Sequence, residues 1–291
     1  MQLCSFCDRP ADTKEHVIPQ WLQRHFHLWD QQLGLWNETA ISYRQALIPA
    51  CHICNNQRFS RLENAVRTND ASEQDLYLWA LKIRYGLSLK DNTLLLDRKS
   101  PQRGPLLPRE IATYGAPFVR HAFRALDNTP FRFSPFPFGS VFLFSHPNVE
   151  PGRFDFVDIP APYWALAITL PQHRILAVLF ADRGVTKRIM RRYAPLKTQI
   201  ENLARHVPEA GARTILFQLL RWQIRLVIPS GVRLANEGVL SDRIPRKIRT
   251  REPKLAWYRQ IAANCGLPDA VAHQAFLRDK DALQVPYLLC G

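Results

Sequence analysis

Residues 51–66 of this 291-residue chain read CHICNNQRFSRLENAV. The stretch opens with a Cys-x-x-Cys pair, and from Asn55 onward it has helical spacing, with Phe59, Leu62 and Val66 on one face. A Cys-x-x-Cys pair brings two thiols into one tight turn, which is the usual half of a structural zinc site. The stretch therefore predicts a metal knuckle that leads directly into a helix.

A second Cys-x-x-Cys pair lies near the N-terminus, about 40 residues earlier. Two such pairs around one small module are poorly explained as chance placements of buried thiols, so we predict a structural Zn²⁺ site. Its predicted ligands are Cys4, Cys7, Cys51 and Cys54. The other two cysteines, Cys265 and Cys290, have no partner at metal-site spacing and are interpreted as ordinary thiols.

The segment between the two pairs favours short strands and one short helix. Thr13–Ile18 and Ile41–Pro49 are extended in character. A proline followed by apolar residues at helical spacing predicts a helix over Gln20–Trp29. Together with the helix of the opening stretch, residues 1–68 are predicted to form a small strand-strand-helix module closed by zinc.

Three residues of this module are candidates for chemistry. Hydrolysis of a phosphodiester with one metal ion needs oxygen ligands for a hard cation and a neutral base that takes a proton from water. Glu15 and Asn55 supply such oxygens, and zinc would hold the strand of Glu15 beside the helix that Asn55 opens. His16, the residue after Glu15, titrates near neutral pH and is the natural general base.

The order Cys-x-x-Cys, Glu-His-Val-Ile-Pro over 15–19, and Cys-x-x-Cys-Asn over 51–55 resembles the zinc-bearing HNH endonucleases of the His-Me finger, or ββα-metal, superfamily, in the subtype of endonuclease VII. The resemblance covers about 60 of the 291 residues. It implies that Glu15 and Asn55 bind catalytic Mg²⁺ or Mn²⁺ and that His16 activates water. It likewise implies that the four paired cysteines bind zinc.

The motif departs from the family at two positions. The commoner dipeptide is Asp-His, so Glu15 must reach the cation with a longer side chain. The middle Asn or His of the family falls about five residues before the third cysteine, where this chain has Gln45-Ala46-Leu47. Gln45 either orients His16 through its amide oxygen or is an ordinary strand residue.

Other polar residues are weaker candidates. Arg58 and Arg61 flank the metal-site helix and are predicted to bind the DNA backbone, although exposed helix arginines need no such role. The remaining candidates are interpreted as surface, structural or turn residues: His25, His27, His52, Asp155 and Asp158.

Beyond the module, charge and periodicity divide the chain further. Residues 69–182 are nearly neutral and are predicted to form an α+β region with a small antiparallel sheet, whereas residues 183–291 hold 20 Lys+Arg against 8 Asp+Glu. This polarised charge favours contact with a polyanion. The basic run Arg243–Lys254 is either part of that surface or a solvated tail. The expected fold class is α+β: a ββα-metal zinc module followed by a mixed antiparallel-sheet and helical region.

Local patterns predict the elements of this larger part. Helices are expected at Glu73–Lys90, capped by Ser72, and at Phe118–Leu126, Thr186–His206, Glu209–Ile228 and Pro268–Leu277. Strands are expected at Ser140–Phe144, Phe154–Val157, Tyr163–Leu170 and Arg174–Phe180, and Ser100–Pro108 is expected to be a loop.

These observations favour a metal-dependent DNA endonuclease with structural zinc, with RNA as a further substrate class and a role in restriction or anti-phage defence. The alternative is a zinc-dependent nucleic-acid-binding protein without catalysis. No signal peptide or bilayer-spanning stretch is recognised, so we expect a cytoplasmic protein that does not engage membranes. A homodimer would suit double-strand cleavage, because one site cuts one strand.

Overall fold

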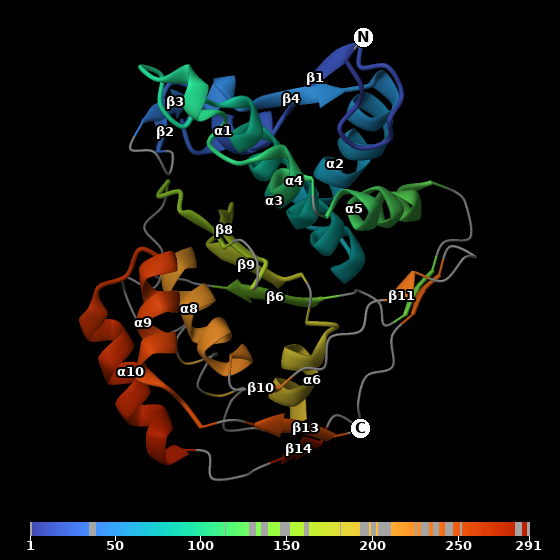
Figure 1. The fold of residues 1–291 in the computed structure, drawn as a ribbon. Helices are drawn as coiled ribbons and strands as arrows, with labels where there is room; N and C mark the ends of the chain where they lie inside the picture. Colours follow the sequence, from blue (N-terminus) through green and yellow to red (C-terminus); the bar gives the residue numbers. More distant parts are fainter. Residues whose placement is uncertain are drawn as a thin grey trace. The chain divides into compact units, whose positions relative to one another are not determined.

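The computed structural model describes residues 2–34, 39–113, 115–127, 132–134, 139–145, 152–159, 163–180, 182–192, 198, 202, 211–224, 226–227, 233–234, 239–241, 247–250, 252–282 and 287–289. The chain forms two compact units, Met1–Phe131 (unit 1) and Arg132–Gly291 (unit 2). The boundaries expected after residues 68 and 182 each fall inside a unit. The fold class is α+β, as predicted (Figure 1).

The core of the N-terminal module is an antiparallel pair of strands, β1 (Thr13–His16) and β4 (Leu47–Ala50), which lie side by side in Figure 1. After β4 the chain enters a seven-residue π-helix, η2 (Ile53–Phe59), which continues as α2 (Ser60–Thr68). The predicted order of strand, strand and helix is therefore present. Because π-helical turns are rare, η2 marks a departure from ordinary helix geometry at the point where the candidate residue Asn55 stands.

Two expected elements of the module differ from the prediction. The strand expected over Ile41–Pro49 is interrupted: β3 (Ala40–Ser42), which pairs with β2 (Gln32–Gly34), is followed by the 3-10 turn η1 (Tyr43–Gln45), and the chain becomes extended again only in β4. The backbone N–H of Ser42 donates to Oε1 of Gln45 at 3.2 Å, which favours the turn. The helix α1 (Gln20–His25) ends before Trp29 because the backbone of His27 is left-handed, with φ 54°.

The long helix α3 (Glu73–Thr93) packs against α2 and carries an unbroken buried run from Leu76 to Leu87. Its predicted cap is confirmed, since Ser72 Oγ accepts from the backbone N–H of Asp75 at 3.1 Å. A Cβ added at Gly86 would lie 3.2 Å from Val17, so glycine permits the close approach of α3 to the strand pair. The rest of unit 1 comprises η3 (Pro101–Arg103), α4 (Arg109–Ala112), α5 (Ala116–Phe123) and η4 (Arg124–Leu126).

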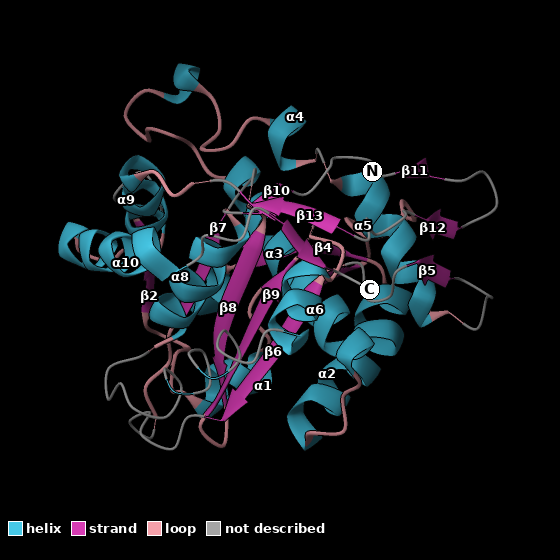
Figure 2. Ribbon diagram, turned by 90° about the horizontal axis from the view of Figure 1, so that it is seen from below, coloured by secondary structure: helices cyan, strands magenta, loops and turns pink. Residues whose placement is uncertain are grey.

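Unit 2 contains the predicted antiparallel sheet, with strand order β6-β9-β8-β7 (Figure 2). The strands are β6 (Ser140–Ser145), β7 (Phe156–Ile159), β8 (Ala165–Leu170) and β9 (Arg174–Leu179). The helix α8 (Ala212–Gln223) contacts β7, β8 and β9. Small inward residues, Ala167 and Ala177, are fully buried in the core of this unit and leave room for the helix.

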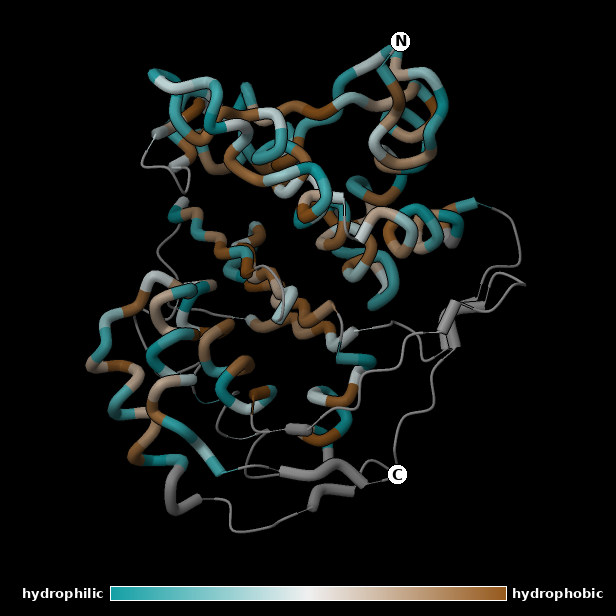
Figure 3. Tube along the Cα trace, in the orientation of Figure 1, coloured by the Kyte–Doolittle hydropathy of each residue, from teal (hydrophilic) through white to brown (hydrophobic). Residues whose placement is uncertain are grey.

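Two C-terminal helices, α9 (Leu255–Asn264) and α10 (Asp269–Ala282), pack against each other, and α9 also contacts α8. Along both helices, hydrophobic and hydrophilic segments alternate (Figure 3). The buried carboxylate of Asp279 accepts from the hydroxyl of Tyr258 at 2.8 Å and lies 3.5 Å from Nε of Arg221, which links the three helices. The sequence predicted α8 and α10 but not α9.

The remaining elements of unit 2 are short: β5 (Arg132–Ser134), α6 (Val185–Arg192), β10 (Leu226–Val227), β11 (Arg233–Leu234), β12 (Val239–Ser241), β13 (Lys247–Thr250) and β14 (Tyr287–Leu289). Some predictions fall on residues outside the described part: Cys290, most of the expected helix after Arg192, and parts of the basic run Arg243–Lys254. Asp158 lies in β7 and not in a turn. Within the described residues, none of the helices combines the length and apolar character needed to cross a membrane.

Candidate metal centre and adjoining cavity

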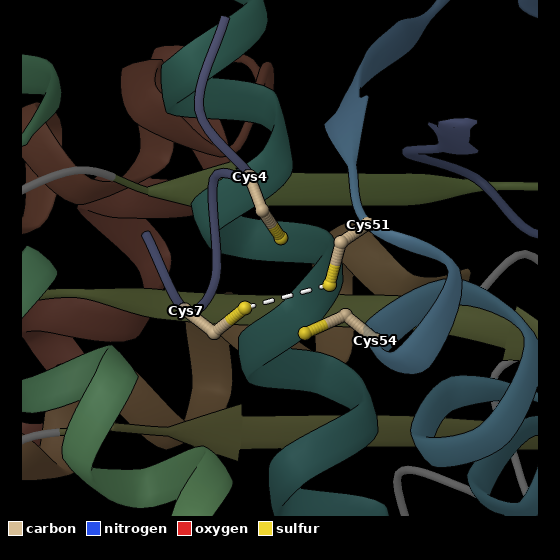
Figure 4. Close-up of side chains that lie close together, drawn as sticks. All are labelled: Cys4, Cys7, Cys51 and Cys54. Atoms are coloured by element: carbon tan, nitrogen blue, oxygen red, sulfur yellow. Dashed lines mark hydrogen bonds between the residues drawn. The ribbon is translucent and has the colours of Figure 1, made fainter. Parts of the chain in front are cut away.

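The four paired cysteines converge in unit 1, with their sulfur atoms turned toward one another (Figure 4). All four Sγ atoms lie within 4.8 Å of one another, and those of Cys7 and Cys51 are 3.5 Å apart. Four thiolates bound tetrahedrally to one zinc ion at ~2.3 Å stand roughly 3.8 Å apart. The predicted cluster is therefore present and has the spacing to bind a metal ion such as zinc.

Local backbone structure explains how the two knuckles meet. The first turn is closed by the N–H of Cys4, which donates to the carbonyl of Arg9 at 2.7 Å, and by Asp8, which has a left-handed backbone. The N–H of Ser5 donates to the carbonyl of Pro49 at 3.0 Å, which fixes this turn to the end of β4. Since Cys51 follows β4 directly, pairing of the first turn with the strand brings all four thiols together.

Charge within the cluster is shared unevenly. A hydrogen bond from Cys54 lowers the pKa of Cys4 to about 4, and the same contact raises the pKa of Cys54. Arg58 lies beside the cluster, where its Nη1 donates to Sγ of Cys54 at 3.4 Å. A permanent cation next to the thiols favours their ionised form, which is the form that binds metal.

The two arginines predicted to bind DNA have partners within unit 1. Arg58 forms a two-bond ion pair with Asp127, at 2.6 and 2.5 Å, and only 13% of its side chain is exposed. Arg61 is exposed, but its Nη2 donates to the carbonyl of Leu126 at 2.9 Å. Both side chains thus tie the metal-site helix to the segment after α5, and contact with DNA remains a prediction for them.

A cavity of about 410 Å³ opens beside the cluster. It is lined by residues of β1, α1, η2 and α2, namely Glu15, Trp21, Asn55, Asn56, Ser60, Glu63, Asn64 and Arg67. The structure therefore brings Glu15 and Asn55 to one cavity, as their predicted shared role requires. His16 does not line it, because adjacent residues of a strand point to opposite faces.

The amide of Asn55 is held in one orientation. Its Nδ2 donates to Oγ1 of Thr13 and to the carbonyl of Lys14, both at 3.2 Å, so that the amide nitrogen faces β1. No hydrogen bond among the described residues takes its Oδ1. An amide oxygen fixed in this way is a suitable ligand for a hard cation.

A buried lysine is the main feature of the site that the sequence analysis missed. Lys82 of α3 donates to Oε1 of Glu15 and to Oε1 of Glu63, and only 1% of its side chain is exposed. Burial disfavours the ammonium ion, but the two carboxylates raise the pKa of Lys82 above its ordinary value. Burial raises the pKa of Glu15, and the charge of Lys82 opposes this rise. With both carboxylates ionised, the three side chains carry one net negative charge, and the described residues donate no hydrogen bond to Oε2 of either glutamate.

His16 lies on the other side of β1, half-buried against the ring of Trp29 at a centroid distance of 5.7 Å. Burial, and the positive charge of Lys82, lower the pKa of His16, so its imidazole is neutral at neutral pH. Its Nε2 is 2.7 Å from the side-chain amide nitrogen of Gln20, and its Nδ1 is buried without a hydrogen-bond partner among the described residues. Gln45 bonds to the backbone of Ser42, so the residue beside the ring is Gln20.

The minor candidates have ordinary environments. Nδ1 of His52 is 2.9 Å from the amide of Asn56, and His25 packs its ring edge to face against Phe26. Asp155 forms an exposed ion pair with Arg213 at 3.0 Å. Cys265 is buried in unit 2, where burial raises its pKa to about 12, as expected for an unreactive thiol.

Comparison with known proteins adds no relative to this description: no protein-family model, no curated protein and no solved structure matches the chain. The resemblance to HNH endonucleases therefore depends on the motif residues and on their arrangement in unit 1.

Proposed function

We propose that the protein is a metal-dependent endonuclease of the HNH kind that hydrolyses DNA phosphodiester bonds. The supporting observation is that Glu15 and Asn55 line one cavity next to the four-cysteine cluster. The proposed catalytic residues, Glu15, His16 and Asn55, all lie on the strand and helix that this cluster joins.

In this proposal zinc has a structural role. A structural zinc site has four protein ligands and no open position, and four thiolates at the observed spacing meet that requirement. Zinc would hold the turn before β1 against the start of η2. The strand that carries Glu15 and the helix that carries Asn55 would then keep their separation when substrate binds.

A second cation, Mg²⁺ or Mn²⁺, would be held by Glu15 and Asn55. The donor set suits it, since a carboxylate with an unoccupied oxygen and an oriented amide oxygen are ligands that hard cations prefer. When bound, such a cation supplies positive charge to the scissile phosphate and to the departing oxygen. Burial raises the pKa of Glu15, whereas the charge and the hydrogen bond of Lys82 act to lower it, so Lys82 favours the ionised carboxylate and fixes one of its oxygens.

His16 is the proposed general base. A neutral imidazole can take a proton from water, and the lowered pKa keeps His16 neutral at physiological pH. Gln20 contacts one ring nitrogen and thereby limits rotation of the ring.

DNA is the proposed partner because of the charge of unit 2. That unit holds 23 Lys+Arg against 12 Asp+Glu, and phosphate neutralisation by such residues drives association with nucleic acid. The chain is proposed to act in the cytoplasm. RNA is a further proposed substrate class. Restriction or anti-phage defence is the proposed biological role of the cleavage.

A non-catalytic nucleic-acid-binding protein is the second candidate. The observation that favours it is the ammonium of Lys82, which already neutralises one of the two carboxylates at the cavity. Both candidates require zinc and DNA binding, but only the nuclease requires His16.

The test is incubation of purified protein with plasmid DNA and with RNA, in Mg²⁺, in Mn²⁺ and with a chelator. We expect metal-dependent cleavage by the wild type and a loss of at least ~100-fold in rate for His16→Ala, with zinc content unchanged. His25→Ala, an exposed histidine on α1, is the matched control and should cut normally. Intact DNA binding without cleavage under any of these conditions would replace the nuclease by the second candidate.

A further inference from the structure

The cavity has a second wall, made by η2 and α2. Asn56, Ser60, Asn64 and Arg67 line it, and all four are exposed. Residues three and four positions apart share one face of a helix, so these side chains form a continuous stripe. The proposed cation would bind at Glu15 and Asn55 and would leave this stripe free.

The outer end of the stripe presents only hydrogen-bond donors. Nη2 of Arg67 donates to Oδ1 of Asn64 at 2.8 Å, which uses the acceptor of that amide. Nδ2 of Asn64 and the remaining N–H groups of Arg67 have no acceptor among the described residues. A guanidinium held by a neighbour, with free donors in a fork, is suited to a phosphate or carboxylate anion.

The other two arginines on this helix do not share this property. Arg58 is paired with Asp127, and Arg61 donates to the carbonyl of Leu126. Neither of them lines the cavity. Arg67 is therefore the arginine that the geometry directs toward a ligand of the cavity. Sequence alone could not separate the three, since each has a plausible exposed position on the helix.

Charge along the cavity is ordered in a way that suits a polyanion. At the inner end, Glu15, Glu63 and Lys82 leave one net negative charge, which a divalent cation would reverse. At the outer end lies the positive charge of Arg67. A DNA strand with one phosphate at the cation and the next phosphate at Arg67 would meet positive charge at both positions.

We propose that Arg67, held by Asn64, binds the backbone phosphate next to the one that is cleaved. The inference rests on the proposed nuclease function, because it takes the inner end of the cavity as the cleavage site. It makes Arg67 a substrate-binding residue that sets the register of the strand. Its contact is with phosphate, so it should act on all base sequences alike.

The test is binding of a fluorescent DNA oligonucleotide to the full-length protein, with Ca²⁺ in place of Mg²⁺, across a series of salt concentrations. We expect Arg67→Gln to weaken binding about tenfold and to reduce the slope of log K against log salt by about 0.9, the value for one lost phosphate contact in duplex DNA. Arg103→Gln is the control: it removes an exposed arginine of the same unit that does not line the cavity, and it should bind within about twofold of the wild type.

A set of oligonucleotides with one neutral methylphosphonate each locates the contact. One position should weaken binding by the wild type but have no effect on Arg67→Gln, because the two changes remove the same interaction. Equal binding by Arg67→Gln and the wild type, or no binding by the wild type, would overturn the inference. Cleavage is measured separately, so a protein that binds DNA through Arg67 but never cuts it would refute the nuclease and not the phosphate contact.

Discussion

The four-cysteine cluster and the cavity meet at adjacent residues, because Cys54 belongs to the cluster and Asn55 lines the cavity. The remaining residues of the two sites are of different kinds. The cluster gathers four cysteine thiols at one point, three of them buried and that of Cys7 partly exposed. The cavity combines carboxylates, amides and a buried ammonium around an open volume of about 410 Å³. A metal site with a full set of ligands supports the fold, whereas oxygens left without partners beside open space are suited to an exchangeable ligand.

Among the substitutions that distinguish the cluster from the cavity, removal of a cysteine ligand should have the largest effect on stability. Cys51→Ser takes one thiolate from the cluster, and structural zinc contributes on the order of 10 kcal/mol of binding free energy, comparable to the whole stability of a domain. We expect loss of bound zinc and unfolding of unit 1, measured by metal analysis and by circular dichroism. Chelation of the wild type should produce the same change.

Cys265→Ala is the control for the cysteine substitution. It removes a buried thiol from unit 2, far along the chain from the cluster, and should retain a full complement of zinc. Normal zinc content and normal thermal stability in Cys51→Ser would show that the four thiols do not form a metal site.

Lys82→Met probes the cavity and should have an intermediate effect. The substitution leaves the buried carboxylate of Glu15 without its countercharge, and breaking a buried ion pair costs about 3–5 kcal/mol. Urea unfolding should show this loss while zinc content is retained. Lys90→Met, a partly buried lysine near the end of the same helix that has no carboxylate partner among the described residues, should change the free energy of unfolding by less than about 1 kcal/mol.

The sign of a second substitution distinguishes loss of charge balance from loss of packing. Glu15→Gln alone should destabilise the protein because Lys82 then keeps only one carboxylate. In the Lys82→Met background the same change should be stabilising, since it removes the unpaired charge. Destabilisation in both backgrounds would mean that the triad contributes through shape and not through charge.

Sequence patterns predicted the cluster and the sheet of unit 2 because those signals are local. Paired cysteines predict a metal knuckle, and short β-branched or aromatic stretches bounded by Pro or Gly predict strands, without knowledge of distant residues. Lys82 lies in the apolar run Leu76–Leu87, and a lysine there is ordinarily expected to extend to solvent. Its partners, Glu15 and Glu63, are 67 and 19 residues away, and only the packing of α3 on the module brings the three together.

The middle residue of the motif was harder to predict for a related reason. Gln45 has the right chemistry at nearly the right spacing, but the turn η1 directs its amide to the backbone of Ser42. Gln20 lies four residues after His16 and is the first residue of α1, directly after Pro19. Spacing along the sequence could not show which of the two amides reaches the imidazole.

The smallest expected effect separates these two glutamines. Gln20→Ala removes the contact with Nε2 of His16, so the ring loses an orienting partner, and we expect kcat for cleavage to fall about tenfold with KM unchanged. Gln45→Ala should leave the cleavage rate within about twofold of the wild type and lower the free energy of unfolding by about 0.5–1 kcal/mol, because it loses one backbone contact. Both variants are measured by single-turnover cleavage and urea unfolding. The reverse pattern would assign the positioning role to Gln45. A rise in KM for Gln20→Ala, with kcat unchanged, would mean that the amide of Gln20 contacts the substrate instead of His16.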